Sequence, residues 1–150
     1  EFQKAVEDET RRRIIVIDTL LEDTLDRLIA QHLQRKDEVL EALTGDNGIR
    51  FTDKARLVYL LNLVDKVTMQ DLLCLHNIRN RFAHVVKPDF SDGELVKHIQ
   101  KLSTVGGTKN NVTEDNYMSF YDKAVGKCTG AICIWQKGPC GGSPQNTNEE

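Results

Sequence analysis

The chain of 150 residues carries 20 basic and 23 acidic side chains and is 39% apolar, which is the profile of one soluble globular domain. Its formal net charge of −3 excludes a protein that covers nucleic acid with positive charge, although a local basic site remains compatible with it. The apolar runs fall far short of the roughly 20 residues that a membrane span requires, and no signal segment opens the chain. We therefore expect a cytoplasmic domain that does not enter a membrane.

Three helices are expected in the first half of the chain. Residues Lys4–Arg35 contain no Gly or Pro and repeat apolar side chains every three to five positions, which predicts one long amphipathic helix. A short second helix is expected over Lys36–Leu43, before the turn signal Gly45–Gly48. Thr52 is the expected N-cap of a third helix over Asp53–Asp65.

Two further helices are predicted by their start and stop signals. The segment Thr68–Asp71 resembles a capping box and opens a fourth helix, which Pro88 stops. The segment Ser91–Glu94 is a stronger capping box and leads into a fifth helix that ends near Ser103.

A last short helix is expected over Thr113–Val125, with Gly126 as its C′ residue. Beyond it the composition shifts to Gly, Pro, Ser and Asn, so we expect an irregular tail over residues 127–150, with Ala131–Trp135 as one β-like segment. The predicted organisation is a helical domain over residues 1–126 followed by this tail. The predicted fold is all-α, a compact bundle of five or six helices in which the first and fourth pack along each other.

The four cysteines do not predict a metal site. Cys128, Cys133 and Cys140 are separated by four and six residues, whereas structural zinc sites favour two to four residues between paired ligands, and no His lies in the tail. Cys74 lies in an apolar run, where it is expected to act as a small hydrophobic side chain. We expect no metal and no other cofactor, and we interpret the tail cysteines as incidental or redox-labile.

The most informative segment is the second half of the fourth helix, which is unusually polar for a central helix. At about 100° per residue, His76, Arg79 and Asn80 lie on one side of it, with His84 at the margin. The candidate functional cluster comprises His76, Arg79, Asn80, Arg81 and His84.

This cluster has a structural and a functional interpretation. In the structural one, Arg79 pairs with a carboxylate of the first helix, such as Glu22 or Asp26, and Asn80 caps backbone groups. In the functional one, Arg79 offers a planar fork of donors to a phosphate and His84 exchanges protons near neutral pH, as cleavage of RNA by its own 2′-hydroxyl requires.

The functional interpretation is accompanied by a short resemblance. Arg79, the polar Asn80 and then His84 resemble the motif of the HEPN superfamily (higher eukaryote and prokaryote nucleotide-binding domains), many of which are metal-independent ribonucleases. The resemblance implies that Arg79 stabilises charge on the phosphate, that His84 moves protons and that Asn80 orients the substrate or His84. Arg79 and His84 are about 140° apart on an ideal helix, so they would need rotamer reach, a distorted turn or a dimer partner to act on one phosphate.

A longer resemblance covers Glu7 to Leu102, about two thirds of the chain. Its segments, in order, are Glu7–Leu33, Phe51–Lys54, Leu57–Val64 and Leu75–His84, and its most specific part is Ile78-Arg79-Asn80 followed by Phe82-Ala83-His84. Together they resemble the mannitol operon repressor (MltR-like) family, in which a Gly usually stands where this sequence has Asn62. The tail has no obvious counterpart in that family.

The longer resemblance implies a repressor-type regulator of sugar-alcohol transport genes. The third and fourth helices are close enough for a helix-turn-helix, but Met69–Leu73 places apolar residues and an acid where a recognition helix needs exposed basic or amide groups. We therefore expect regulation through a protein partner and not through direct DNA readout, with the ribonuclease as the alternative in which RNA is bound. A homodimer is also expected, because Ile15 and Ile29 lie off the main apolar stripe of the first helix.

Overall fold

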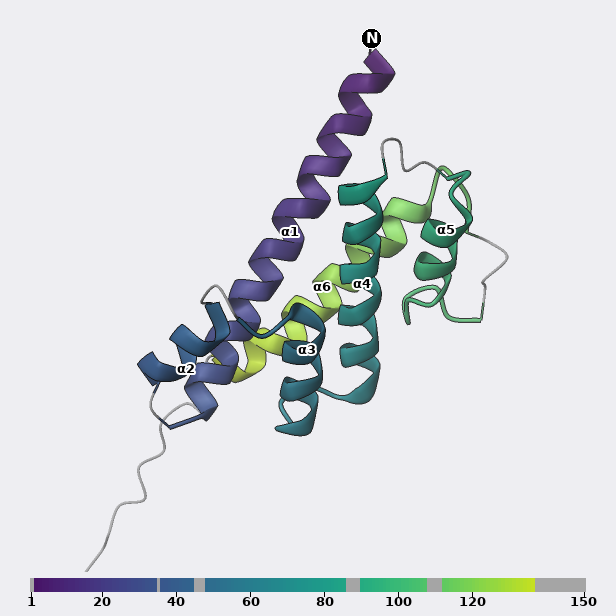
Figure 1. Ribbon diagram of the computed structural model, residues 1–150. Coiled ribbons are helices and arrows are strands. Elements are labelled where there is room, and N and C mark those ends of the chain that lie inside the picture. Colours follow the sequence, from purple (N-terminus) through teal and green to yellow (C-terminus); the bar gives the residue numbers. More distant parts are fainter. Residues whose placement is uncertain (1, 35, 45–47, 86–89, 108–111, 137–150) are drawn as a thin grey trace, which may run out of the picture.

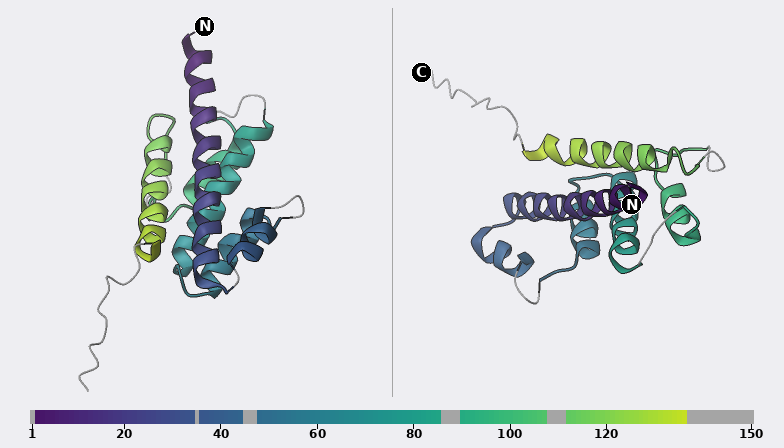
Figure 2. Two further views of the ribbon diagram at one scale, coloured as in Figure 1. Left: turned by 90° about the vertical axis from the view of Figure 1, so that its left-hand side faces the viewer. Right: turned by 90° about the horizontal axis from the view of Figure 1, so that it is seen from above.

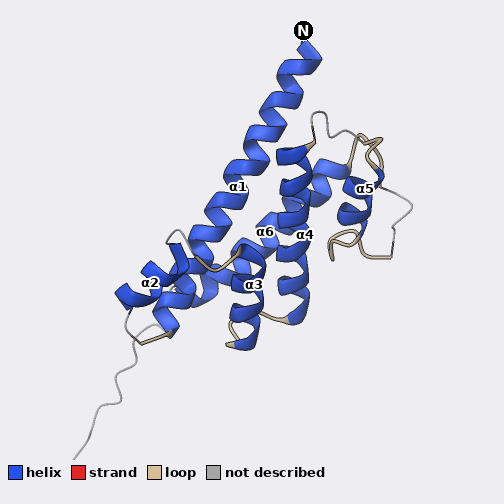
Figure 3. Cartoon of the chain, in the orientation of Figure 1, coloured by secondary structure: helices blue, strands red, loops and turns tan. Residues whose placement is uncertain are grey.

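The computed structural model describes residues 2–34, 36–44, 48–85, 90–107 and 112–136. Over these ranges the chain is helical, without a strand, which confirms the all-α prediction (Figure 3). The helices are α1 (Phe2–His32), α2 (Lys36–Thr44), α3 (Phe51–Leu60), α4 (Lys66–His84), α5 (Gly93–Gln100) and α6 (Tyr117–Gln136). None of the described helices is both long and apolar enough to cross a bilayer.

Helix α4 lies at the centre of the bundle and packs against α1, α3, α5 and α6 (Figure 1). The expected packing of the first helix on the fourth is therefore confirmed. Seen from above, α1 lies between α6 on one side and α2 and α3 on the other (Figure 2). The core contains side chains that are at most 1% exposed, among them Leu25, Leu28, Leu72, Leu75 and Ile78. Burial of each such side chain stabilises the fold by about 1.5–3 kcal/mol.

The apolar side chains that α1 leaves exposed are not the ones expected. Ile29 is completely buried within the bundle and Ile15 is partly buried, so the two residues on which the dimer prediction rested belong wholly or partly to this chain's own packing. Val16 and Leu20 are instead 56% and 60% exposed. The helical periodicity of α1 agrees with the prediction, but α2, α3, α4 and α6 all pack against this helix, which buries more than one stripe of it.

Helix α3 begins and ends earlier than predicted. Arg50 is its N-cap, so Thr52 lies within the first turn. At its other end Asn62 has a φ of 58°, in the left-handed region. The amide of Asn62 donates to the carbonyl of Tyr59, and the amide of Leu63 donates to that of Val58, both at 2.9 Å. These two bonds form a Schellman motif, which stops the helix before Asp65.

The fourth and fifth helices are capped by aspartates and not by the predicted residues. Asp65 caps α4, and its carboxylate accepts from the amide of Thr68 at 2.7 Å. Asp92 caps α5 and accepts from the amides of Glu94 and Leu95 at 3.1 and 3.5 Å. Ionised carboxylates are strong acceptors at a helix N-terminus. Pro88, the predicted stop of the fourth helix, lies outside the described residues.

The largest correction concerns α6, which was expected to end at Val125 with Gly126 as its C′ residue. The helix continues through Gly126 to Gln136, so the β-like segment predicted over Ala131–Trp135 is helical. Cys128 and Ile132 are completely buried on it and belong to the hydrophobic core. This burial outweighs the roughly 1 kcal/mol by which a glycine disfavours a helix interior. Residues 137–150 of the expected tail, including Cys140, lie outside the described residues.

Candidate functional site

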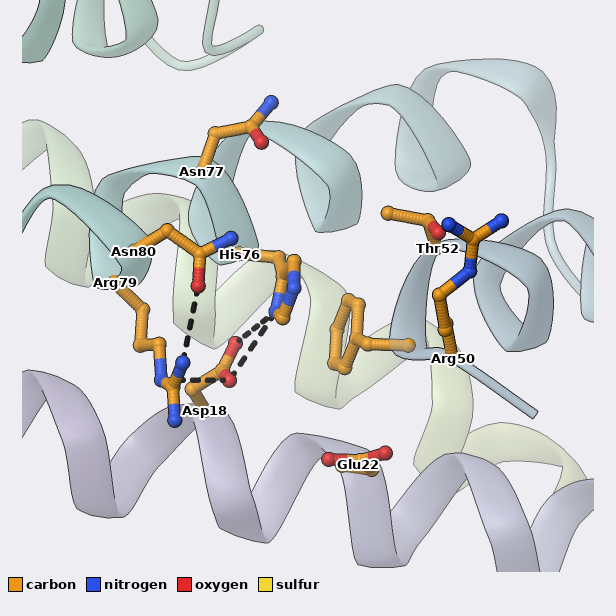
Figure 4. Close-up of a pocket in the computed structure, with 9 residues that line it drawn as sticks. Asp18, Glu22, Arg50, Thr52, His76, Asn77, Arg79 and Asn80 are labelled. Atoms are coloured by element: carbon orange, nitrogen blue, oxygen red, sulfur yellow. Dashed lines mark hydrogen bonds and ion pairs between the residues drawn. The ribbon is translucent and has the colours of Figure 1, made fainter. Parts of the chain in front are cut away.

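An open pocket of about 420 Å³ lies where α1, α3 and α4 meet (Figure 4). The residues that line it are Asp18, Glu22, Arg50, Phe51, Thr52, His76, Asn77, Arg79 and Asn80. Arg50 and Thr52 lie at one end, and Arg79 and Asn80 at the other. The structure thus brings together three members of the predicted cluster, from the central part of α4.

Asp18 of α1 holds two of these side chains in place. Its carboxylate is 5% exposed, and its two oxygens lie 3.1 and 3.2 Å from Nδ1 of His76. With its proton on Nδ1, the imidazole donates to Asp18 and keeps Nε2 as the nitrogen that can exchange a proton. The ring of Phe51 stacks on the imidazole, with the centroids 4.5 Å apart and the planes 4° apart. The orientation of His76 is therefore fixed from two sides.

Arg79 lies on the other side of Asp18, with Nε 3.5 Å from Oδ2 of the carboxylate. This distance fits an ion pair and is too long for a strong hydrogen bond, and Nε is buried without a hydrogen-bond partner in the described structure. Nη1 donates to the side-chain oxygen of Asn80 at 3.0 Å. The side chain of Arg79 is 32% exposed, so its remaining N–H groups can reach a ligand.

The predicted partner of Arg79, a carboxylate of the first helix, is confirmed, but the residue is Asp18 and not Glu22 or Asp26. Glu22 and Asp26 are taken by Lys54 of α3, whose Nζ lies 2.8 and 2.9 Å from their oxygens and whose side chain is 3% exposed. Burial by itself lowers the pKa of Lys54, but its hydrogen bonds to the two carboxylates outweigh burial and raise the pKa. Asn80 likewise bonds the side chain of Arg79 and not the backbone groups expected.

Arg81 and His84 are not among the residues that line this pocket. Arg81 donates from Nε and Nη2 to one oxygen of Asp92, at 2.9 and 2.8 Å, and so joins the end of α4 to the start of α5. His84 is the last residue of α4 and is exposed. The histidine that shares a pocket with Arg79 is therefore His76.

Sequence reasoning missed Asp18, although a signal was present. Asp18 falls in phase with Ile14, Leu21 and Leu25 on the buried face of α1, where an acid is unusual unless it has a partner. The positions of Phe51 and Arg50 carried no comparable signal, because they reach the pocket only through the packing of α3 on α4.

No protein-family model, no curated protein and no solved structure matches this chain. Within the described ranges, no group of three or more His, Cys, Asp or Glu side chains is arranged to hold a metal ion. The pocket thus presents the oriented imidazole of His76, the guanidinium groups of Arg50 and Arg79, and the amides of Asn77 and Asn80.

Proposed function

We propose that the chain is a repressor-type regulatory protein of the mannitol operon repressor kind, which acts through contacts with other proteins and not by reading DNA. The observation that supports this mode of action is the surface of the N-terminal half of α4, the helix that a helix-turn-helix would insert into the major groove. Thr68 and Asp71 are at most 3% exposed, and the exposed side chains of this half are Lys66, Val67 and Gln70. A recognition helix needs several exposed basic or amide side chains there to contact base edges, whereas this half presents one lysine, one valine and one glutamine.

The side chain of Asp71 shows why this half of α4 is not released by a small movement. Its carboxylate accepts from the backbone amide of Ser103 at 2.8 Å and from the hydroxyl of the same residue. Lys127 of α6 lies 3.5 Å from it. Exposing Asp71 to DNA would break its contacts with the segment after α5 and with α6, and the hydrogen bonds that stabilise its carboxylate would be lost.

The proposal is tested in the cell and with purified protein. Deleting the gene is expected to raise the transcripts of sugar-alcohol transport genes, and the reintroduced wild-type chain is expected to restore repression. The purified chain is expected to leave duplex DNA from those promoters unbound at physiological salt, as measured by fluorescence anisotropy. Unchanged transcripts would overturn the regulatory role, and tight sequence-specific DNA binding would overturn the mode of action.

A metal-independent ribonuclease is the second candidate, supported by the pairing of His76 and Arg79 through Asp18. Here Nε2 of His76 takes the proton of a 2′-hydroxyl, the 2′-oxygen attacks phosphorus, and the bond to the 5′-oxygen breaks as that oxygen takes up a proton from water in the open pocket. Arg79 stabilises the charge that develops on the phosphate. His76 replaces His84 in this scheme, because His84 does not line the pocket.

Incubation of purified protein with RNA in the presence of a chelator separates the two candidates. The regulatory proposal expects intact RNA with the wild-type chain. Cleavage that is lost in His76→Asn and Arg79→Lys but kept in His84→Ala would establish a nuclease centred on Asp18. Cleavage lost in Arg79→Lys and His84→Ala but kept in His76→Asn would favour the motif expected from the sequence. Helix content measured by circular dichroism serves as the folding control for each variant.

A further inference from the structure

One face of α1 is left uncovered by the other described helices. In the left view of Figure 2, α1 lies in front of the bundle, with α6 to one side and α2 and α4 to the other. We define the outer stripe as the exposed residues Glu9, Arg13, Val16, Leu20, Asp23 and Arg27. These positions form two series with a seven-residue spacing, so they follow one side of the helix.

The outer stripe has an apolar centre and charged ends. Val16 and Leu20 are 56% and 60% exposed, which is unusual for two neighbouring large aliphatic side chains on one helix face. Glu9 and Arg13 precede them, and Asp23 and Arg27 follow them. An acid and a base therefore lie on each side of the apolar centre, in the same order along the chain.

This order of charges is self-complementary only when a second copy runs in the opposite direction. If Val16 lies beside Leu20 of the partner subunit, Arg13 lies opposite Asp23 of the partner subunit. Glu9 then lies opposite Arg27 of the partner subunit. A parallel pairing in register would instead place each charge beside its own copy. Charge complementarity thus selects a second copy of this chain, in antiparallel orientation, as the occupant of the outer stripe.

The middle of α1 is also the centre of this pairing. The two-fold axis that relates the two copies passes between Val16 and Leu20. The two α1 helices therefore overlap over almost their whole length of about 46 Å. The N-terminal turns of α1 extend beyond the other helices (Figure 1). In the antiparallel pair these turns lie along the far end of the α1 helix of the partner subunit.

The charges of the outer stripe remain available for such contacts. Arg13 pairs with Asp122 of α6, and Arg27 lies 2.9 Å from Asp23, but all four side chains are at least 42% exposed. Exposed ion pairs of this kind contribute little to the stability of a single chain. We propose that the chain forms a two-fold dimer through antiparallel packing of the outer stripe, an interface that does not depend on the regulatory role proposed above.

Sedimentation velocity of the full chain over a range of concentrations tests the interface. The wild type is expected to be a dimer at tens of micromolar, and Leu20→Lys is expected to weaken the dimer by at least roughly tenfold, because it places a charge in the apolar centre. Leu60→Lys is the matched control, since Leu60 is 76% exposed on α3 and lies outside the stripe. A monomeric wild type would overturn the proposal, and so would a dimer that Leu20→Lys leaves intact.

A charge exchange tests the antiparallel register. Glu9→Arg and Arg27→Glu are each expected to weaken the dimer several-fold, because each places like charges opposite one another twice in a two-fold pair. The double variant restores opposite charges and is expected to return to within about twofold of the wild type. A double variant that is as weak as the single variants would rule out this register. All these positions are exposed, so the helix content of every variant should equal that of the wild type.

Discussion

Asn62 ends α3 through its backbone conformation. At a φ of 58° an ordinary side chain is strained, whereas Asn tolerates this region better than most and Gly adopts it freely. The turn lets Leu63 and Val64 fold back into the core, where they are 5% and 7% exposed. The Gly expected at this position from the MltR-like pattern meets the same backbone requirement.

Replacing Asn62 separates this backbone effect from packing, since the side chain is exposed. Asn62→Val is expected to lower the free energy of unfolding by about 1–2 kcal/mol, because a β-branched residue is disfavoured at positive φ. Asn62→Gly is expected to be neutral or slightly stabilising. Urea denaturation measures both, with Leu60→Val in the last turn of α3 as a control that should cost only a few tenths of a kcal/mol. Equal losses at positions 60 and 62 would contradict this account.

Asp18 is the residue on which the pocket depends. Asp18→Ala would leave His76 without its hydrogen-bond acceptor and Arg79 without its ion-pair partner, and it is expected to destabilise the fold by roughly 1–3 kcal/mol. Asp8→Ala, on the same helix, exposed and outside the outer stripe, is the matched control and should change stability by no more than about 0.5 kcal/mol. Thermal unfolding of the two variants gives the comparison. A loss at Asp18 no larger than that at Asp8 would show that the pair with His76 and Arg79 contributes nothing to stability.

At the scale of elements, α4 and α5 are joined by one carboxylate. Asp92 caps α5 and also accepts two hydrogen bonds from Arg81 at the end of α4. Burial alone raises the pKa of Asp92, but the hydrogen bonds from Arg81 and from the amides of Glu94 and Leu95 lower it below its usual value. The ionised carboxylate therefore stabilises the fold above about pH 4, the ordinary value for Asp, and this contribution is lost as the pH falls through the lower folded pKa.

Two variants separate the contribution of the Asp92 charge to stability from the contribution of its capping hydrogen bonds. At pH 7, Asp92→Ala is expected to lose about 0.5–2 kcal/mol or more, because both the cap and the ion pair are removed. Asp92→Asn keeps a capping oxygen and is expected to lose less. The difference between wild type and Asp92→Asn should shrink in urea denaturation below about pH 4. A difference that stays constant with pH would mean that the charge of Asp92 does not contribute.

The second half of α6 is tested by two isoleucines that lie two residues apart. Ile132 is fully buried and Ile134 is 72% exposed. Ile132→Ala is expected to destabilise the fold by about 2–5 kcal/mol. Ile134→Ala should change stability by no more than about 0.5 kcal/mol, as surface substitutions usually do. Similar small losses at both positions in chemical denaturation would indicate that this part of the chain does not contribute to the core.

At the scale of the whole molecule, α4 connects the bundle because it contacts four other helices, and α6 contacts α1, α4 and α5. Trp135 of α6 is the single tryptophan of the chain, and its ring lies 6.0 Å from that of His32 at the end of α1. Since these contacts join all parts of the described bundle, we expect one cooperative unfolding transition. Tryptophan fluorescence and far-ultraviolet circular dichroism should then give the same midpoint in urea. An earlier fluorescence transition would show that the end of α6 unfolds independently.

Apolar periodicity and the positions of Gly and Pro were sufficient to predict the class of fold and the positions of most helices. Apolar spacing and the absence of Gly and Pro over Lys4–Arg35 were sufficient for α1, because helical periodicity is a local property of the chain. Helix ends were predicted less well. Near Asp65 and Asp92 several Ser, Thr and Asp side chains could accept hydrogen bonds from the same helix amides. The path of the loop decides which of them becomes the N-cap.

Packing between helices sets which polar groups meet and where α6 ends, and neither could be predicted from local patterns. The spacing of residues along α4 places Arg79 on a face but does not measure its distance to Asp18, Glu22 or Asp26, and Lys54 of α3 takes the last two. Likewise, the composition around Gly126 favours a helix end, yet burial of Cys128 and Ile132 against the bundle continues the helix. Partner choice and burial depend on the three-dimensional packing of separate elements, which outweighs the local preferences that a sequence displays.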